Sequence, residues 1–119
     1  MVDKRGEYLI TFVTAPNEEE AERLAEKTVS EGLAACCNII PGVKSIYTWK
    51  GRVCKEGEVL CVFKTTGELF EKFKERVISL HSYEVPEVTA VEIKAGYKRY
   101  LDWIDEVTGK GSHGGGTGE

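Results

Sequence analysis

The stretch VKSIYTWKGRVCKEGEVLCVF, from Val43 to Phe63, decides the fold. Two runs rich in β-branched and aromatic residues meet at Lys50-Gly51, which predicts a β-hairpin with a two-residue tip. Residues Leu33 to Ile40 continue the first run upstream, and the intervening Pro41-Gly42 is typical of a bulge in a long strand. The second run extends to Thr65. We therefore expect a hairpin with about fourteen residues in each arm, longer than most strands.

The segments on both sides of the hairpin alternate between strand and helix patterns. Tyr8 to Val13 is a compact run of aromatic and β-branched residues, typical of a buried strand. Asn17 is a predicted N-cap, and apolar residues then recur at helical spacing until Gly32. After the hairpin, the patterns predict a helix from Thr66 to Leu80, a strand from Val88 to Ile93, and a third amphipathic helix after Gly96.

This order, βαββαβ followed by a helix, predicts an α+β protein with the ferredoxin-like split βαβ sandwich. In that arrangement a four-stranded antiparallel sheet carries two helices on one face. The predicted hairpin is too long for such a sheet and should protrude from it. Its apolar residues need cover, and we expect another copy of the chain to provide it; they are Ile46, Tyr47, Trp49 and Val53. The alternative is that the chain's own third helix covers the hairpin.

The composition indicates one globular domain, which we place at residues 1–108 of the 119. Residues 109–119 are rich in glycine and lack an apolar anchor, so we predict a disordered tail in which His113 is solvated. The net charge of −4 and the dispersed basic residues argue against a nucleic-acid partner. No apolar stretch is long enough to span a membrane, and the N-terminus lacks an apolar signal core. We therefore expect a cytoplasmic protein without a membrane partner.

Four cysteines, at positions 36, 37, 54 and 61, show no CxxC spacing. In a cytoplasmic protein they are expected to stay reduced and to act as small core hydrophobes. Pairing about the hairpin tip predicts that Cys54 lies opposite Tyr47 and Cys61 opposite Ile40, so that no cysteine faces another across the hairpin.

The best candidate for chemistry is the run His81-Ser82-Tyr83-Glu84-Val85-Pro86-Glu87. Pro86 disfavours helical angles at the residue before it, so the run is predicted to be an extended connection that presents its side chains. An imidazole together with carboxylates suits divalent copper, zinc or nickel, which makes His81, Glu84 and Glu87 the candidate ligands. The alternative is that His81 is merely a cation at a helix C-terminus and the glutamates are solvated. The acidic cluster at Glu18, Glu19, Glu20 and Glu22 is interpreted as a solvated helix start.

Several segments together resemble the CutA divalent-cation tolerance family. They are TAPNEEEA at 14–21, GLAAC at 32–36, IIPGVKSIYTWKG at 39–51, EV at 58–59, KTT at 64–66, HSYEVPE at 81–87 and YLDW at 100–103. The resemblance implies a ferredoxin-like homotrimer whose long hairpin embraces a neighbouring subunit. It also implies cytoplasmic binding of copper or another divalent cation, a part in metal tolerance, and His81 and Glu87 as metal ligands.

Two positions depart from the family pattern. Some members have a cysteine where this chain has Val13, and the usual proline after the histidine is Ser82 here. Without a thiolate, the remaining nitrogen and oxygen donors favour Cu(II), with Zn(II) and Ni(II) as alternatives, over Cu(I).

Two other functions are weighed against metal binding. A PII-like trimer that senses small molecules has the same fold plan, and Tyr83, Lys64 and Arg52 could then serve an anionic ligand. An enzyme could use His81 and Glu84 as an acid–base pair, but no nucleophile has a partner by motif, so we expect no enzymatic activity.

Overall fold

The computed structural model describes residues 7–109 and has the α+β class that the sequence predicts. The elements are β1 (Tyr8–Ala15), α1 (Glu18–Ser30), β2 (Cys36–Trp49), β3 (Arg52–Thr66), α2 (Phe70–Leu80), β4 (Thr89–Glu92) and α3 (Lys98–Val107). Nearly all of the predicted tail lies outside the described residues. Gly109, assigned above to that tail, donates its backbone N–H to the carbonyl of Gly32 at 2.9 Å.

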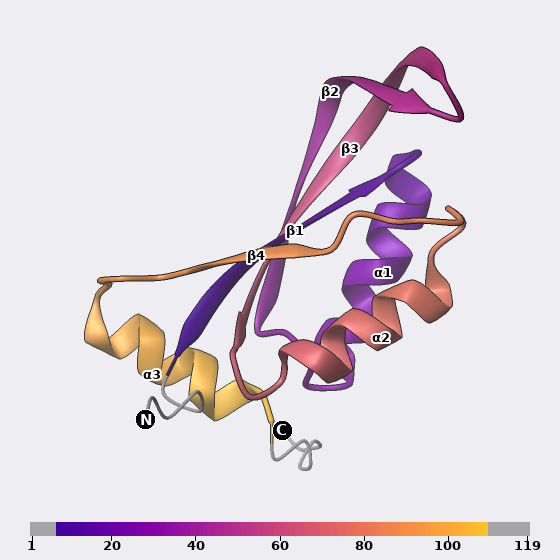
Figure 1. Ribbon diagram of the computed structural model, residues 1–119. Helices are drawn as coiled ribbons and strands as arrows, with labels where there is room; N and C mark the ends of the chain where they lie inside the picture. Colours follow the sequence, from indigo (N-terminus) through magenta and orange to yellow (C-terminus); the bar gives the residue numbers. More distant parts are fainter. Residues whose placement is uncertain (1–6, 110–119) are drawn as a thin grey trace.

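The four strands form one antiparallel sheet in the order β2-β3-β1-β4. Helices α1 and α2 lie side by side against this sheet (Figure 1). This is the ferredoxin-like arrangement, so the fold prediction is confirmed. The predicted N-cap is also confirmed, because the Asn17 Oδ1 atom accepts the Glu20 N–H at 2.8 Å. Within residues 7–109, no helix has both the length and the apolar character needed to cross a membrane.

The core lies between the helices and one face of the sheet. Alternate strand residues on this face, among them Val13, Cys61 and Phe63, have no exposed surface, and they pack against Leu24 and Phe73 from the two helices. The rings of Phe63 and Phe73 meet edge to face, with their centroids 4.8 Å apart. This contact joins β3, one of the two inner strands of the sheet, to α2.

The opposite face of the sheet is also apolar, but little of this chain covers it. Alternation places Phe12, Leu60 and Val62 on this open face, where each is only partly buried. Val91, opposite Ile10 on the edge strand, is 51% exposed. Strands that are apolar on both faces are typical of sheets covered on both sides. Residues 7–109 of a single chain leave most of one of these two sides without cover.

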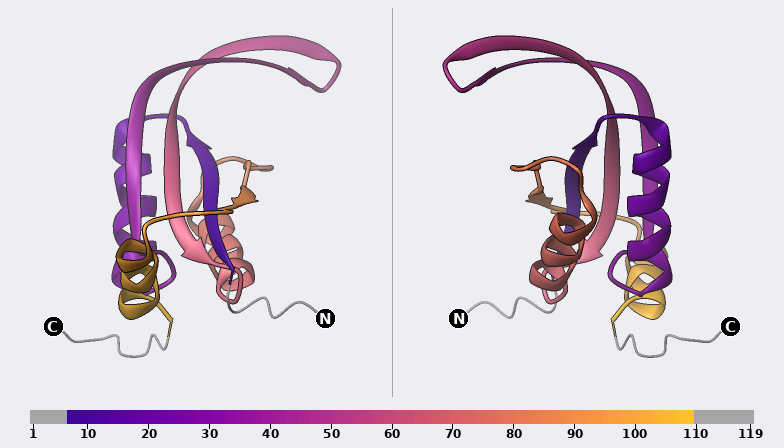
Figure 2. Two further views of the ribbon diagram at one scale, coloured as in Figure 1. Left: turned by 90° about the vertical axis from the view of Figure 1, so that its left-hand side faces the viewer. Right: turned by 90° about the vertical axis from the view of Figure 1, so that its right-hand side faces the viewer.

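The hairpin forms as predicted and rises well beyond the sheet. Lys50 and Gly51 form its two-residue tip, with φ angles of 52° and 79°, between the paired residues Trp49 and Arg52. The register shifts between Ile40 and Val43, which confirms a bulge at the predicted position. Seen from the side, the two strands bend into an arch over the rest of the molecule (Figure 2).

The bulge makes one predicted cross-strand pair wrong. Tyr47 lies opposite Cys54 as expected, but Cys61 lies opposite Ile39 and not Ile40. The bulge adds one residue to β2 only, and a shift of one residue moves side chains to the other face. Cys61 is therefore a diagonal neighbour of Cys37 on the core face, and the contact between the two thiols raises the pKa of Cys37. All four cysteines are free thiols.

Helix α3 lies at the end of the sheet farthest from the hairpin tip (Figure 1). The Tyr8 hydroxyl donates to Asp105 Oδ2 at 2.5 Å, and Cys36 Sγ lies 3.6 Å from the Tyr100 hydroxyl. This helix therefore covers one end of the open face and leaves the hairpin bare. The alternative in which the third helix covers the hairpin is wrong, and Ile46 and Val53 remain 62% and 72% exposed.

The contact between β1 and α3 gives a prediction about pH. The hydrogen bond to Asp105 raises the pKa of Tyr8 from 10.0 to about 12. A raised pKa means that the contact stabilises the fold fully below pH 10 and loses its contribution as the pH rises towards 12. We expect the difference in tyrosinate absorbance between the natural protein and Tyr8→Phe to titrate near pH 12.

Substituting each of the two carboxylates near Tyr8 tests which of them raises the Tyr8 pKa. Asp105→Asn should return the Tyr8 pKa towards 10.0, because it removes the ionised acceptor. Asp102→Asn should move it far less, since Asp102 is the weakest contributor. Equal shifts in the two variants would contradict the assigned contact.

Candidate functional site

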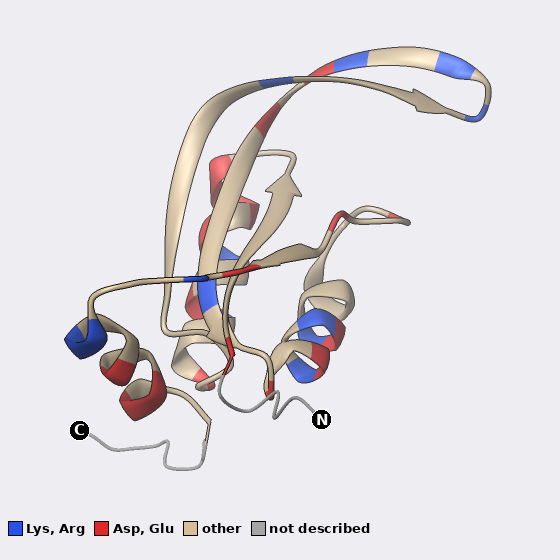
Figure 3. Cartoon of the chain, turned by 60° about the vertical axis from the view of Figure 1, so that its left-hand side comes forward, with Lys and Arg blue, Asp and Glu red and all other residues tan. Residues whose placement is uncertain are grey.

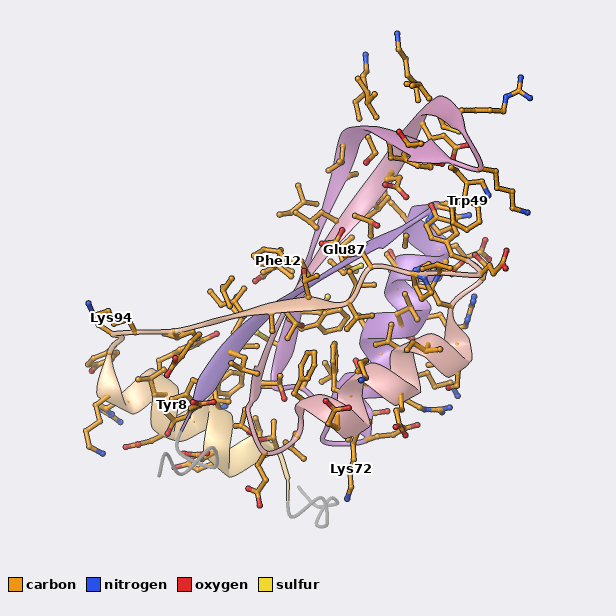
Figure 4. The ribbon with its side chains drawn as sticks, viewed as in Figure 1. Tyr8, Phe12, Trp49, Lys72, Glu87 and Lys94 are labelled. Atoms are coloured by element: carbon orange, nitrogen blue, oxygen red, sulfur yellow. The ribbon has the colours of Figure 1, made fainter. Side chains whose placement is uncertain are left out.

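A pocket of about 670 Å³ lies between the hairpin arch and the segment 81–87. It is lined by Thr14, Ser45, Ile46, Tyr47, Trp49, Glu56, Glu58, Ser82, Tyr83, Glu84, Val85 and Glu87. The structure thus brings the predicted segment together with a part of the hairpin that no sequence motif assigns to a site. In Figure 4 the Trp49 side chain lies beneath the arch, on the side of this segment.

His81 fixes the start of the segment from inside the protein. Its side chain has no exposed surface. The ring Nε2–H donates to the carbonyl oxygen of Thr14 at 2.7 Å, and Nδ1 accepts the backbone N–H of Tyr83 at 3.1 Å. These partners define the neutral tautomer with the proton on Nε2. The sequence interpretation of His81 as a presented side chain is wrong, because the helix ends with this residue turned towards the core.

Glu20 supports the same segment from α1. Its carboxylate accepts the Ser82 N–H at 2.8 Å and lies 3.4 Å from His81 Nδ1. The residue is only 6% exposed, so the prediction of a solvated acidic cluster is wrong for Glu20, whereas Glu18, Glu19 and Glu22 are exposed. The sequence signal at this position, the N-cap at Asn17, indicated where the helix begins and not that Glu20 has a partner distant in sequence.

The two predicted carboxylate ligands have a different setting from His81. Glu84 and Glu87 are exposed at the pocket, and Glu87 Oε2 accepts the Thr89 hydroxyl at 3.0 Å. Two further carboxylates, Glu56 and Glu58, reach the same pocket from β3. The pocket therefore contains four acidic side chains from two segments.

Tyr83 connects the segment to the hairpin. Its hydroxyl donates to Glu58 Oε2 at 2.5 Å, and its ring centroid lies 4.7 Å from that of His81. Burial and this hydrogen bond raise the pKa of Tyr83 well above its ordinary value. Tyr83 therefore stays neutral at physiological pH, and it holds the segment against the arch.

The donor set of this pocket fits a divalent cation only in part. A neutral imidazole binds a metal through its unprotonated nitrogen, and in His81 that nitrogen already accepts the Tyr83 N–H. Within residues 7–109, no three histidine, cysteine or acidic side chains converge closely enough to hold an ion. The exposed carboxylates offer oxygen ligands, so a bound ion would keep water or take ligands from another chain.

The pocket does not contain the residues proposed for an anionic ligand, except Tyr83. Arg52 does not line it, and Lys64 lies on the open sheet face, where its Nζ donates to Asn38 Oδ1 at 2.7 Å. Among residues 7–109, none of those that line the pocket is a lysine or an arginine. Lysine and arginine positions lie instead towards the hairpin tip, and glutamate positions lie farther from the tip on β3 (Figure 3).

Fold and site together define a class: small α+β proteins of ferredoxin-like topology with a protruding hairpin above an acidic, aromatic pocket. The family model described as "CutA1 divalent ion tolerance protein" matches residues 9–107, and the chain belongs to this family.

Relatives agree over most of the chain. The divalent-cation tolerance protein CutA of Thermus thermophilus is 49% identical over 100 residues, which cover 84% of this chain and 97% of the relative. The chloroplastic protein CutA 1 of Oryza sativa is 44% identical over 84% of this chain, but this chain spans only 56% of that protein.

Solved structures show the same fold. The divalent cation tolerance protein of Thermus thermophilus has a TM-score of 0.84 at 48% identity, covering 86% of this chain and 99% of that chain. The periplasmic divalent cation tolerance protein CutA of Archaeoglobus fulgidus has a TM-score of 0.82 at 40% identity, covering 84% and 97%.

Proposed function

We propose that this chain forms a cytoplasmic homotrimer that binds divalent cations, Cu(II) first among them, and contributes to metal tolerance without catalysing a reaction. The observation that supports this proposal best is the pocket with four carboxylates and no basic lining residue, in a chain of the divalent ion tolerance family. Negative charge that no lining cation neutralises favours a positively charged ligand.

Self-association is supported by two apolar surfaces that this chain leaves bare. The first is the open sheet face around Phe12 and Val62, and the second is the part of the hairpin at Val53, a residue that does not line the pocket. A hairpin that reaches in one direction forms a heterologous contact, and such contacts form a ring when the rotation between copies closes. Three copies in the ring is the number that the family resemblance implies.

In this proposal Glu84 and Glu87 are metal ligands, because both are exposed at the pocket. His81 can be the third ligand only if its Nδ1 exchanges the hydrogen bond from Tyr83 for a bond to the metal. Ligands from a neighbouring copy, or water, would complete the coordination. Oxygen-rich coordination of this kind gives modest affinity and no preference for Cu(I).

The cytoplasmic location is a separate part of the proposal, because some relatives are named for other locations. The Oryza sativa relative is named chloroplastic and the Archaeoglobus fulgidus protein periplasmic. Fractionation of cells that express the complete natural protein tests this part, and recovery outside the cytoplasmic fraction would contradict it.

Calorimetric titration with Cu(II) tests the ligands. The protein should carry His113→Ala, which removes the imidazole in the terminal tail and leaves His81 as the only histidine. In this background Glu84→Gln and Glu87→Gln should each weaken Cu(II) binding by about tenfold or more, because each removes an oxygen ligand. Glu26→Gln, at an exposed position on α1, is the matched control and should leave the affinity unchanged.

Pulsed electron paramagnetic resonance of the Cu(II) complex then tests His81 without disturbing the buried ring. A signal from the remote imidazole nitrogen in the His113→Ala protein can come only from His81. Its presence supports His81 as a ligand, and its absence restricts His81 to holding the segment in place. No heat from Cu(II), Zn(II) or Ni(II) with the natural protein would overturn the metal-binding proposal as a whole.

A further inference from the structure

We propose that the pocket under the arch also binds an organic cation, a protonated amine carried on an apolar body. This inference goes beyond metal binding, because it rests on the size of the pocket and on its aromatic walls. It shares only the carboxylates with the proposed function.

The volume is the first reason. A pocket of about 670 Å³ far exceeds the space of a hydrated metal ion, since six waters of about 30 Å³ each occupy about 180 Å³. It falls in the range of sites that hold small organic molecules. A bare ion would leave most of this space to water.

The walls are the second reason. Three aromatic side chains line the pocket: Tyr47 and Trp49 from β2, and Tyr83 from the segment below. Aromatic rings contribute little to the binding of a hydrated metal ion, but their faces attract organic ammonium groups. The structure already contains such a contact, because Lys50 Nζ lies 5.7 Å from the centroid of the Trp49 ring.

The negative charge of the pocket lining favours a positively charged ligand. Glu56, Glu84 and Glu87 are exposed carboxylates in the lining, and they can accept hydrogen bonds from an ammonium group. Glu58 is already engaged by the Tyr83 hydroxyl, which fixes the position of that ring. With no lysine or arginine in the lining, an anionic ligand of the same shape would find no partner.

Val85 and Ile46 supply the apolar part of the site. Both line the pocket, and they are 67% and 62% exposed in the single chain. A ligand with an apolar body can bury this surface while its ammonium group stays near the carboxylates. The expected ligand therefore has one charged end and one apolar end.

Three compounds with the same phenyl body test the inference: phenethylamine, phenethyl alcohol and 3-phenylpropionate. They are titrated separately into the full chain while the two tryptophan indole N–H resonances are followed by NMR. The chain has two tryptophans, and Trp103 does not line the pocket but belongs to α3, at the end of the sheet away from the hairpin tip (Figure 1), so it serves as an internal control. Phenethylamine should shift the Trp49 resonance alone, and the effect should weaken as salt is added. The alcohol and the carboxylate should bind much more weakly.

Two matched variants test whether the aromatic ring of Trp49 itself contributes to binding. Trp49→Leu keeps an apolar side chain but removes the π face, and it should weaken phenethylamine binding by about two- to thirty-fold. Binding in Trp49→Leu is followed by calorimetry, and Trp103→Leu should leave the affinity unchanged. Equal binding of all three compounds, or no shift of Trp49 with any of them, overturns the inference. The second result is also expected if the basic hairpin tip of a neighbouring copy fills the pocket.

The Cu(II) titration of the same protein keeps the two proposals apart. Cu(II) binding without phenethylamine binding rejects the organic cation and leaves the metal proposal standing. Phenethylamine binding without any metal binding rejects the metal proposal and leaves this one.

Discussion

Phe12→Asp should convert the proposed trimer into folded single chains. Phe12 lies near the centre of the open sheet face, on an inner strand between β3 and β4, and faces away from the two helices. A carboxylate there would be buried without a partner if another copy covered this face, which costs several kcal/mol. A ring of three copies contains the substituted residue three times, so the cost is repeated in each contact.

The single chain should tolerate this change, because Phe12 is not part of the core on the helix side. Light scattering at low micromolar concentration should give three chain masses for the natural protein and one for Phe12→Asp. Circular dichroism and the dispersion of NMR resonances should show that the separated chains remain folded. Phe12→Leu, which keeps an apolar side chain, should remain trimeric.

Two further variants keep this prediction falsifiable. Val29→Asp places the same charge on an exposed helix position and should not change the mass. If Phe12→Asp fails to fold, Val91→Asp tests the same face, because Val91 is half exposed on the edge strand of the single chain. A natural protein that is a well-folded monomer would contradict the assembly outright.

Most of the fold could be predicted from local chemistry. The two-residue tip at Lys50-Gly51, the bulge at Pro41-Gly42 and the cap at Asn17 each depend on a few neighbouring residues, and each was predicted correctly. Helix and strand ends differ by a few residues, as at β4, where Thr89–Glu92 replaces the expected 88–93. Such ends depend on tertiary pairing more than on composition.

The register beyond the bulge could not be predicted in the same way. Counting back from the tip assumes equal numbers of residues in both strands, and the bulge adds one residue to β2 alone. The sequence shows where a bulge occurs but not how many residues it leaves unpaired. No cysteine is paired directly with another, as predicted, but that single residue made Cys61 a diagonal neighbour of Cys37 on the core face.

Only the part of the site that lies in one contiguous segment, residues 81–87, was predicted from the sequence. His81, Glu84 and Glu87 belong to one run, but Trp49, Glu56 and Glu58 reach the pocket because the hairpin bends over this run. The curvature of a long hairpin arises from strand twist and the bulge, and no residue in segment 81–87 signals it. The burial of His81 was missed for a related reason, since its partners Thr14 and Glu20 are distant in sequence.

Glu20→Ala should loosen the segment 81–87 and lower the free energy of unfolding by about 2 to 3 kcal/mol. The Glu20 carboxylate is 6% exposed and accepts the Ser82 N–H, so alanine leaves that donor without its partner and opens space beside His81. Hydrogen exchange measured by NMR should show faster exchange of the Ser82 and Tyr83 amides, with little change in α1.

Two substitutions on the same helix turn serve as controls for this effect. Glu20→Gln keeps an oxygen that can accept the Ser82 N–H, so it should cost clearly less than Glu20→Ala. Glu19→Ala, at an exposed neighbouring position, should change stability by no more than about 0.5 kcal/mol. The hydrogen bonds of the Ser82 and Tyr83 amides hold the segment that carries Glu84 and Glu87 at the pocket. Glu20→Ala should therefore also weaken the binding of Cu(II) and of phenethylamine. Unchanged exchange at both amides would show that α2 and Pro86 hold the segment without Glu20, and the role assigned to the buried carboxylate would then be wrong.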